Sequence, residues 1–207
     1  MNKYIKYFLS ISLLKSIYYS FKFKGKILIG HNTKIQADKN GRIIINKDGY
    51  LTIGVKTNLP QGTILEMGKD SIIKVNGKVH LYKGSKIVIG NNAILEIGDG
   101  TFINEHSKLV CQKKICIGDN CAIGWNVNIL DTDYHNLINN GKENIKNKSI
   151  IIGNHVRIGC NCTILKGIEI GSNSVIGAQS LVNRNILSNT LNVGNPCSKI
   201  KDTVNWK

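Results

Sequence analysis

The sequence lacks three features that would assign it to a common class of protein. Its six cysteines include no CxxC pair, which a structural zinc site would be expected to have. Its most apolar segment, residues 1–24, is interrupted by Lys6 and Lys15 and is too short to span a bilayer. No small-residue cleavage site follows that segment, as a signal peptide would require. We therefore expect a cytoplasmic protein whose thiols are reduced and which needs no metal.

Acidic residues are also scarce. The chain of 207 residues has 13 Asp and Glu against 28 Lys and Arg, a formal net charge of +15. This balance favours an anionic partner, which could be nucleic acid, a membrane surface or a phosphorylated ligand. The lysines are scattered among Asn and Ile and are not clustered on a helix or interleaved with aromatic residues, so nucleic acid is disfavoured. A phosphate-bearing small molecule or a membrane surface fits better.

A period of six residues dominates the second half of the chain. Residues 152–187 divide without a gap into six hexads, each of which opens with Ile or Val. This period fits neither the 3.6 residues of a helical turn nor the alternation of a strand. It is the signature of a hexapeptide β-helix, in which three hexads make one triangular coil and stacked aliphatic residues fill the axis. We predict an all-β protein, a left-handed parallel β-helix.

The hexad also predicts what each of its positions does. The first residue should point inward, and the fifth should lie near a corner that admits only a compact side chain. A second-position glycine should tolerate the backbone angles of the turn. Cys121 and Cys162 occupy fifth positions, so packing explains these two thiols.

The pattern divides the chain into an N-terminal segment (1–24), a β-helix (25–187) and a C-terminal tail (188–207). The hexads are ragged between residues 25 and 100, where we expect an architectural role. The N-terminal segment is apolar, aromatic and basic. It is either a cap over the open end of the β-helix or an amphipathic segment on the inner membrane surface. We favour the cap, because every solenoid needs one.

The repeat stops completely at residues 131–149, a stretch rich in Asn, Lys and Asp. A long polar loop that leaves a regular solenoid is a common location for function. This loop contains His135, and histidine is the side chain that is largely neutral yet able to accept a proton near pH 7. The nearby Asp131 and Asp133 could hold its tautomer. We predict that His135 is a general base.

Four motifs carry a family resemblance: DTDYH from residue 131, SIIIGNHVRIG from 149, ILKGIEIGSNSVIGAQSLV from 164 and VGNPCSKIK from 193. With them the chain resembles the left-handed β-helix acyltransferases. Within these it resembles the maltose and galactoside O-acetyltransferase-like group that also modifies bacterial surface polysaccharides. The resemblance implies transfer of an acetyl group from acetyl-CoA, as co-substrate, to a sugar hydroxyl. It also implies a homotrimer with active sites between adjacent subunits.

The resemblance also implies roles for particular residues. His135 would remove the proton of the attacking hydroxyl, and Asn104 would stabilise the oxyanion that develops on the thioester carbonyl. Asp133 and Asp131 would orient His135 or bind acceptor hydroxyls. The remaining predicted acceptor contacts are aromatic faces for a sugar ring, and they belong to Trp125 and Tyr134.

The donor is expected at the last coils and the tail. Cys160 and Ala178 match positions where the family's backbone meets the pantetheine arm. Arg184 and Lys201 match its basic residues near the CoA phosphates, and Lys199 adds a nearby charge.

The sequence departs from the family's pattern in two places. Arg157 stands where the family commonly has a tryptophan, which changes the expected contact near CoA. The first hundred residues do not form the helical cap of the maltose and galactoside enzymes. We therefore expect a polysaccharide or a lipid-linked precursor as the acceptor, at the cytoplasmic face of the membrane.

Three other functions can be compared with the sequence. An N-acetyltransferase of a nucleotide-linked amino sugar would use the same base and the same donor site, and it is the main alternative. A hexapeptide carbonic anhydrase needs three histidines around zinc, two of them close in sequence, but the five histidines lie at least twenty residues apart. A structural β-helix would show regular outward rows of threonine and no ejected loop.

Overall fold

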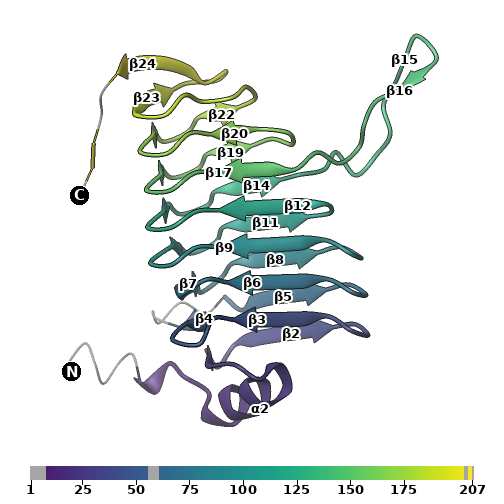
Figure 1. The fold of residues 1–207 in the computed structure, drawn as a ribbon, viewed down its shortest axis with the longest axis vertical. Coiled ribbons are helices and arrows are strands. Elements are labelled where there is room, and N and C mark those ends of the chain that lie inside the picture. Colours follow the sequence, from purple (N-terminus) through teal and green to yellow (C-terminus); the bar gives the residue numbers. More distant parts are fainter. Residues whose placement is uncertain (1–7, 56–60, 203–204, 207) are drawn as a thin grey trace.

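A computed structural model describes residues 8–55, 61–202 and 205–206. The chain winds into a left-handed parallel β-helix, a column of triangular coils with a short helix at its N-terminal end (Figure 1). The predicted fold class is confirmed.

Each coil contributes strands to three sheets, which form the three faces of the column. Sheet 1 consists of β1 (Ile27–Ile29), β4 (Tyr50–Val55), β7 (Lys78–Tyr82), β10 (Phe102–Ile103), β13 (Ala122–Ile123), β18 (Arg157–Ile158), β21 (Val175–Ile176), β23 (Thr190–Val193) and β24 (Ser198–Asp202). Sheet 2 consists of β2 (Thr33–Ala37), β5 (Thr63–Met67), β8 (Lys86–Ile89), β11 (Lys108–Cys111), β14 (Asn128–Leu130), β19 (Thr163–Ile164) and β22 (Leu181–Val182). Sheet 3 consists of β3 (Arg42–Ile45), β6 (Ile72–Val75), β9 (Ile94–Ile97), β12 (Lys114–Ile117), β17 (Ile150–Ile152) and β20 (Glu169–Ile170).

Three corners join these faces. We call the turn from sheet 1 to sheet 2 corner 1, the turn from sheet 2 to sheet 3 corner 2, and the turn from sheet 3 back to sheet 1 corner 3. The same corner of successive coils forms a column of residues along the outside of the molecule, because the strands pair in parallel register.

The core is a stack of aliphatic side chains along the axis. In sheet 3, Ile97, Ile117, Ile152 and Ile170 pair in register from one coil to the next, and each is at most 2% exposed. Fifth-position residues such as Cys162 are also buried. The predicted inward positions of the hexad are therefore confirmed. A single coil could not bury these side chains, so the stack stabilises every coil through its neighbours.

The turns correct one expectation. In the hexads of residues 152–187, the residues with left-handed backbone angles are fourth-position residues, among them His155, Asn161 and Asn173, and not the second-position glycines. Asn adopts this conformation more readily than most side chains. The second-position glycines are needed because the next coil lies against them. A Cβ on Gly153 would lie 2.7 Å from the backbone nitrogen of Ser172.

Helix α2 (Leu13–Phe23) lies across the first coil and supplies partners to strands that would otherwise form an open edge. The backbone nitrogen of Ile29 donates to Oγ of Ser16, and that of Ile27 donates to Oγ of Ser20. Lys15 donates from Nζ to two backbone oxygens at the start of sheet 2. Side chains of the helix thus take the place of a preceding coil. Within the described residues, no helix has the length and apolar character to cross a membrane.

The loop of residues 131–149 leaves the column between β14 and β17, at corner 2, and projects away from it (Figure 1). Its tip is an antiparallel hairpin of β15 (Ile138–Asn139) and β16 (Lys142–Glu143). At its neck, Thr132 donates from Oγ1 to Oδ1 of Asn147, at 2.7 Å. The loop is therefore closed at its base and extended beyond it.

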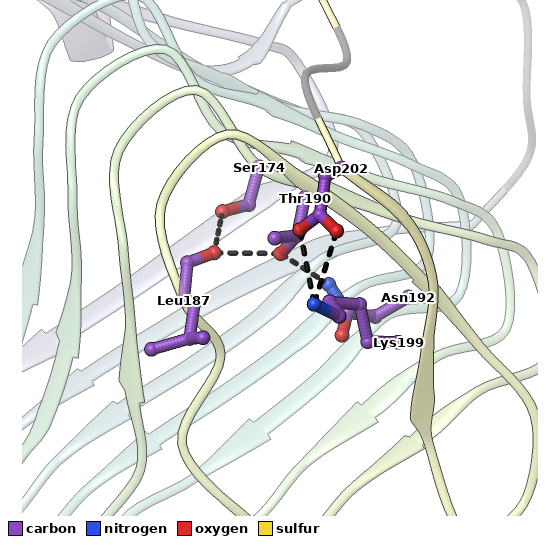
Figure 2. A network of polar contacts seen from close by, with 6 residues as sticks. All are labelled: Ser174, Leu187, Thr190, Asn192, Lys199 and Asp202. Atoms are coloured by element: carbon purple, nitrogen blue, oxygen red, sulfur yellow. Dashed lines mark hydrogen bonds and ion pairs between the residues drawn. The ribbon is translucent and has the colours of Figure 1, made fainter.

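The C-terminal end of sheet 1 is closed by β24, which pairs antiparallel with β23. Figure 2 shows the polar contacts of this end. Ser174 and Thr190 both donate a hydroxyl to the backbone oxygen of Leu187, at 2.8 and 2.7 Å. The buried Asn192 donates to Oγ1 of Thr190. These bonds tie the tail to the last coil.

We predict that Gly153→Ala lowers the free energy of unfolding by about 2–3 kcal/mol, because the added methyl group overlaps the next coil. Gly141→Ala is the control. Gly141 also has a backbone angle that suits glycine, but a Cβ there would meet no atom within 4 Å. Its cost should be about 1 kcal/mol from backbone strain alone. Urea unfolding of both variants measures the difference, and equal losses would contradict the close-approach argument.

Candidate active site

A groove of about 300 Å³ runs over the outer surface of sheet 1. It brings together residues from three coils and from the tail. Four of the predicted site residues line it: Asn104, Trp125, Arg157 and Cys160. Phe102, Ala122 and Trp206 are among the other residues that line it.

Corner 1 explains why distant segments meet here. Trp125, Cys160 and Ala178 each follow a second-position glycine in successive coils, so the three are stacked at this corner. The backbone oxygen of Trp125 accepts from Asn161, and that of Cys160 accepts from Gln179. A Cβ on the glycine before Cys160 would lie 2.8 Å from the Cα of Ala178. Trp125 and Cys160 of this column line the groove.

The indole of Trp125 is held in place at this corner. Its Nε1 donates to Oε2 of Glu105 at 2.6 Å, and Glu105 is the residue at the equivalent hexad position one coil earlier. Trp125 is 53% exposed, so the rest of the ring is available to a ligand.

Asn104 follows strand β10 and lies at the opening of corner 1. Its backbone is held on both sides, since its nitrogen donates to Ile123 and its oxygen accepts from the hydroxyl of Ser85. Among the described residues its side-chain amide has no hydrogen-bond partner, although it lines the groove. The amide can therefore donate to a ligand.

His135 is exposed on the ejected loop. Its backbone nitrogen donates to the backbone oxygen of Asp133, but within the described part of the chain its ring has no hydrogen bond or ion pair. The carboxylate of Asp133 instead forms an ion pair with Lys166. The structure therefore places an unconstrained imidazole at corner 2, away from the groove lining at corner 1.

The chain is similar to several known proteins. The sequence model of the family described as bacterial transferase hexapeptide (six repeats) matches residues 149–184. The structure of the polySia-specific acetyltransferase NeuO is 25% identical over 85% of this chain and 89% of its own, with a TM-score of 0.61. The polysialic acid O-acetyltransferase OatWY is 26% identical over 86% of this chain and 92% of its own, with a TM-score of 0.60. A maltose O-acetyltransferase from Clostridium difficile 630 is 31% identical over 67% of this chain and 70% of its own, with a TM-score of 0.46. A search of curated proteins found no match.

The chain belongs to the hexapeptide-repeat acyltransferases. In this acyltransferase the predicted site residues fall into two groups. One group lines the groove or borders it at corner 1, and the other lies at corner 2 or on the tail.

Three predicted phosphate contacts of the acyltransferase lie apart from the groove within one chain. Arg184 follows β22 and lies at corner 2. Lys201 is exposed on β24. Lys199, on the same strand, donates to both carboxylate oxygens of Asp202, at 3.0 and 3.1 Å (Figure 2). An exposed ion pair of this kind is weak and can be exchanged for another anion.

Asp131 has a structural part in the acyltransferase. It is fully buried, and its two carboxylate oxygens accept the backbone N–H groups of Gln112, Lys113 and Lys114 at 2.6–2.8 Å. Burial raises the pKa of this carboxyl, while the three N–H groups act in the opposite direction. Asp131 thus holds the turn that leads into β12, and its carboxylate is not exposed to an acceptor.

Tyr134 lies next to His135 and is 54% exposed. Its backbone nitrogen donates to Oγ1 of Thr132 at the neck of the loop. The phenol is therefore accessible beside the imidazole, on the same loop and not in the groove.

Two further residues that shape the groove were not predicted from the sequence: Glu105, which holds the indole of Trp125, and Trp206, which lines the groove. Glu105 could have been found by aligning the hexads, because it lies one coil before Trp125 in the same position. Trp206 lies beyond the repeat, where the sequence offers no period to place it.

We predict that Asp131→Asn lowers the free energy of unfolding by about 2–3 kcal/mol, because the amide would set an NH₂ group against N–H donors in a buried site. Asp133→Asn should lower it by about 1 kcal/mol or less, because that carboxylate pairs with Lys166 near the surface. Denaturant unfolding of the two variants tests this. A greater loss for Asp133→Asn would contradict the structural role of the Asp131 carboxylate.

Proposed function

We propose that this acyltransferase moves an acetyl group from acetyl-CoA to a hydroxyl of a bacterial surface polysaccharide or of its lipid-linked precursor. The observation that carries the proposal is the groove, where the free amide of Asn104 and the exposed ring of Trp125 lie beside Cys160. The similarity over most of the chain to two acetyltransferases named for polysialic acid supports this class of acceptor.

The reaction we propose is a direct attack. A sugar hydroxyl is too weak an acid to ionise at neutral pH, so His135 accepts its proton as the oxygen attacks the thioester carbon. The amide of Asn104 donates to the oxyanion that forms on the carbonyl oxygen. When the C–S bond breaks, the thiolate of CoA leaves and takes up a proton, which the imidazolium can return.

An acyl-enzyme intermediate is not needed, because the thioester is already activated. Cys160 is the thiol in the groove lining, and within the described residues no histidine is hydrogen-bonded to it. The nucleophile of the proposed reaction is therefore the acceptor hydroxyl.

The geometry of the coil supports a site shared between subunits. Asn104 lies at corner 1 and the loop that carries His135 leaves at corner 2, so one sheet face separates them in a single chain. The loop projects outward, as it would to reach a neighbouring column (Figure 1). We propose a homotrimer with C3 symmetry, in which the loop of one subunit faces the groove of the next. In this arrangement Arg184, at the same corner as the loop, could reach the phosphates of a donor held by the neighbour. Lys199 and Lys201 lie on β24 of sheet 1, the face that carries the groove of their own chain.

We predict that His135→Ala lowers turnover at least about 100-fold, as expected for loss of a general base, while CoA still binds. Release of free CoA thiol in the presence of a sialylated or other capsular polysaccharide measures turnover. The product should be an ester that mild base removes, whereas an amide would survive and favour the N-acetyltransferase alternative. Turnover above about a tenth of wild type would remove His135 from the base role.

Mixed oligomers provide a control for this prediction. Subunits with His135→Ala and subunits with Asn104→Ala should each be nearly inactive alone. After unfolding and refolding together in equal amounts, about a quarter of the sites in a random C3 trimer would combine an intact His135 with an intact Asn104. Recovery of that activity supports the shared site, and no recovery would mean that both residues act within one chain.

We also propose that the exposed face of helix α2 binds the surface of a membrane that contains anionic lipids. The side of the helix that faces away from the column exposes Leu14, Ile17 and Phe21, which are 84%, 67% and 87% exposed. These residues are three and four positions apart and share one helix face. Residues 8–37 carry five lysines and no Asp or Glu. An apolar helix face with surrounding positive charge is typical of binding to the surface of a bilayer that contains anionic lipids.

The trimer would strengthen this contact. With three columns side by side and parallel, all three helices would lie at the same end, and multivalent binding would add to the affinity of each. The cytoplasmic face is where such an enzyme would meet a lipid-linked precursor.

We predict that Leu14→Ser combined with Phe21→Ser lowers flotation with vesicles of phosphatidylcholine containing about 30% phosphatidylglycerol by at least about tenfold. Leu187→Ser is the control, because this leucine is also exposed (70%) but lies near the other end of the column. Unchanged flotation of the double variant would refute the membrane contact. A double variant whose oligomeric mass changes while its flotation does not would also refute the membrane contact, because the helix face would then be used in contacts between subunits.

A further inference from the structure

Trp206, near the end of the chain, returns to the β-helix after the antiparallel strand β24. Its ring stacks on that of His155, with centroids 4.4 Å apart and planes 7° from parallel. Its Nε1 donates to the backbone oxygen of the same residue at 3.0 Å. The imidazole of His155 is itself held at Nδ1, 3.2 Å from Oδ1 of Asn173 in the next coil. Two neighbouring coils thus fix the position of this indole.

This position is opposite Trp125 across the groove. His155 is the fourth-position residue of corner 3, and Cys160 stands at corner 1 beside Trp125. The chain between them is β18, the strand that crosses sheet 1. Five residues of extended chain separate the two corners, about 16 Å. The groove therefore spans a face of the column and has an indole at either side, since both tryptophans line it.

The residues of the groove between the two indoles suit a ligand that is long, partly apolar and anionic. Phe102 and Ala122 supply apolar surface, and Arg157 exposes a guanidinium that forms no ion pair with the described residues. Tryptophan faces bind flat or methylene-rich groups, and an unpaired arginine binds phosphate. An acyl thioester on a phosphorylated carrier combines these properties.

We infer that Trp206 forms the second wall of the acyl-donor groove, so that the C-terminal tail completes the donor site of its own chain. This inference rests on the proposed function, because it takes the groove to be where the thioester donor binds. It adds a donor-binding residue that belongs to no hexad. It also gives the tail a part in the reaction beyond closing the end of sheet 1.

The composition of the chain makes this testable without an activity assay. Trp125 and Trp206 are the two tryptophans of the sequence, and both line the groove, so the intrinsic tryptophan fluorescence arises from this site. In a Trp125→Phe background the emission comes from Trp206 alone. Titration with CoA should change that emission, with saturation at the same CoA concentration that calorimetry gives for this variant.

The main test compares CoA binding to Trp206→Ala, Trp206→Phe and the wild type by calorimetry. We expect Trp206→Ala to weaken binding about tenfold, through loss of the aromatic contact, and Trp206→Phe to restore most of it. The KM for acetyl-CoA should rise in parallel, while kcat at saturating donor stays within about twofold of wild type. Ile200→Ala is the matched control, since this tail residue is exposed and does not line the groove. It should leave CoA binding unchanged.

The outcomes separate this inference from the proposed function. If the wild type itself does not bind CoA, the proposed function fails and this inference fails with it. A different result overturns only this inference. The wild type and Trp206→Ala would bind CoA equally well, and CoA would leave the emission of Trp206 in the Trp125→Phe variant unchanged. Tighter binding by Trp206→Ala would also overturn it, because the indole would then be occupying the donor's place. An unchanged melting temperature of Trp206→Ala shows that the fold is intact, as expected for a residue outside the core.

Discussion

Consecutive coils of this protein are spaced like paired strands, about 4.8 Å apart. This spacing determines both the packing of the core and the contacts between neighbouring turns on the surface. Inside, it brings aliphatic side chains of the same hexad position into contact along the axis. Outside, it requires glycine wherever one turn lies flat on the next, as at Gly153. It also lets a polar side chain reach the backbone of the coil before it. Oδ1 of Asn154, for example, accepts from the nitrogen of Asp119.

Because side chains fill the axis, chemistry in such a fold is left to the outer surface, above all to the corners and the segments that leave them. Each corner is a column with one residue from each coil, so a ligand that lies along it meets residues far apart in sequence. Trp125 and Cys160 are neighbours for this reason. Different corners of one coil face different directions, which is why Asn104 and His135 do not meet in a single chain. In the homotrimer that we propose, a second copy brings the two together.

The sequence predicted the features that follow from the six-residue period. The inward positions and the ejected loop come from counting hexads, and the same count, carried further, would have placed Trp125 and Cys160 at one corner. The six-residue period carries no information about a side chain outside the hexads that hydrogen-bonds to the backbone of another coil. Asp131 looked like a partner of His135 because the two are close in sequence, but the carboxylate is buried beneath the turn before β12. Trp206 was missed because a segment after the last hexad has no register that could be counted.

The column also fixes how far the site lies from the end that carries helix α2. Helix α2 lies beneath the first coil and Trp125 belongs to the fifth, so four coil spacings, about 19 Å, separate the coil that contacts the helix from Trp125. Under the membrane contact that we propose, with the column upright on a bilayer, a sugar attached directly to a lipid headgroup would lie below the reach of the site. Sugars further along a growing chain would pass beside it. The number of coils would then set the minimum length of the sugar chain that the proposed reaction can modify.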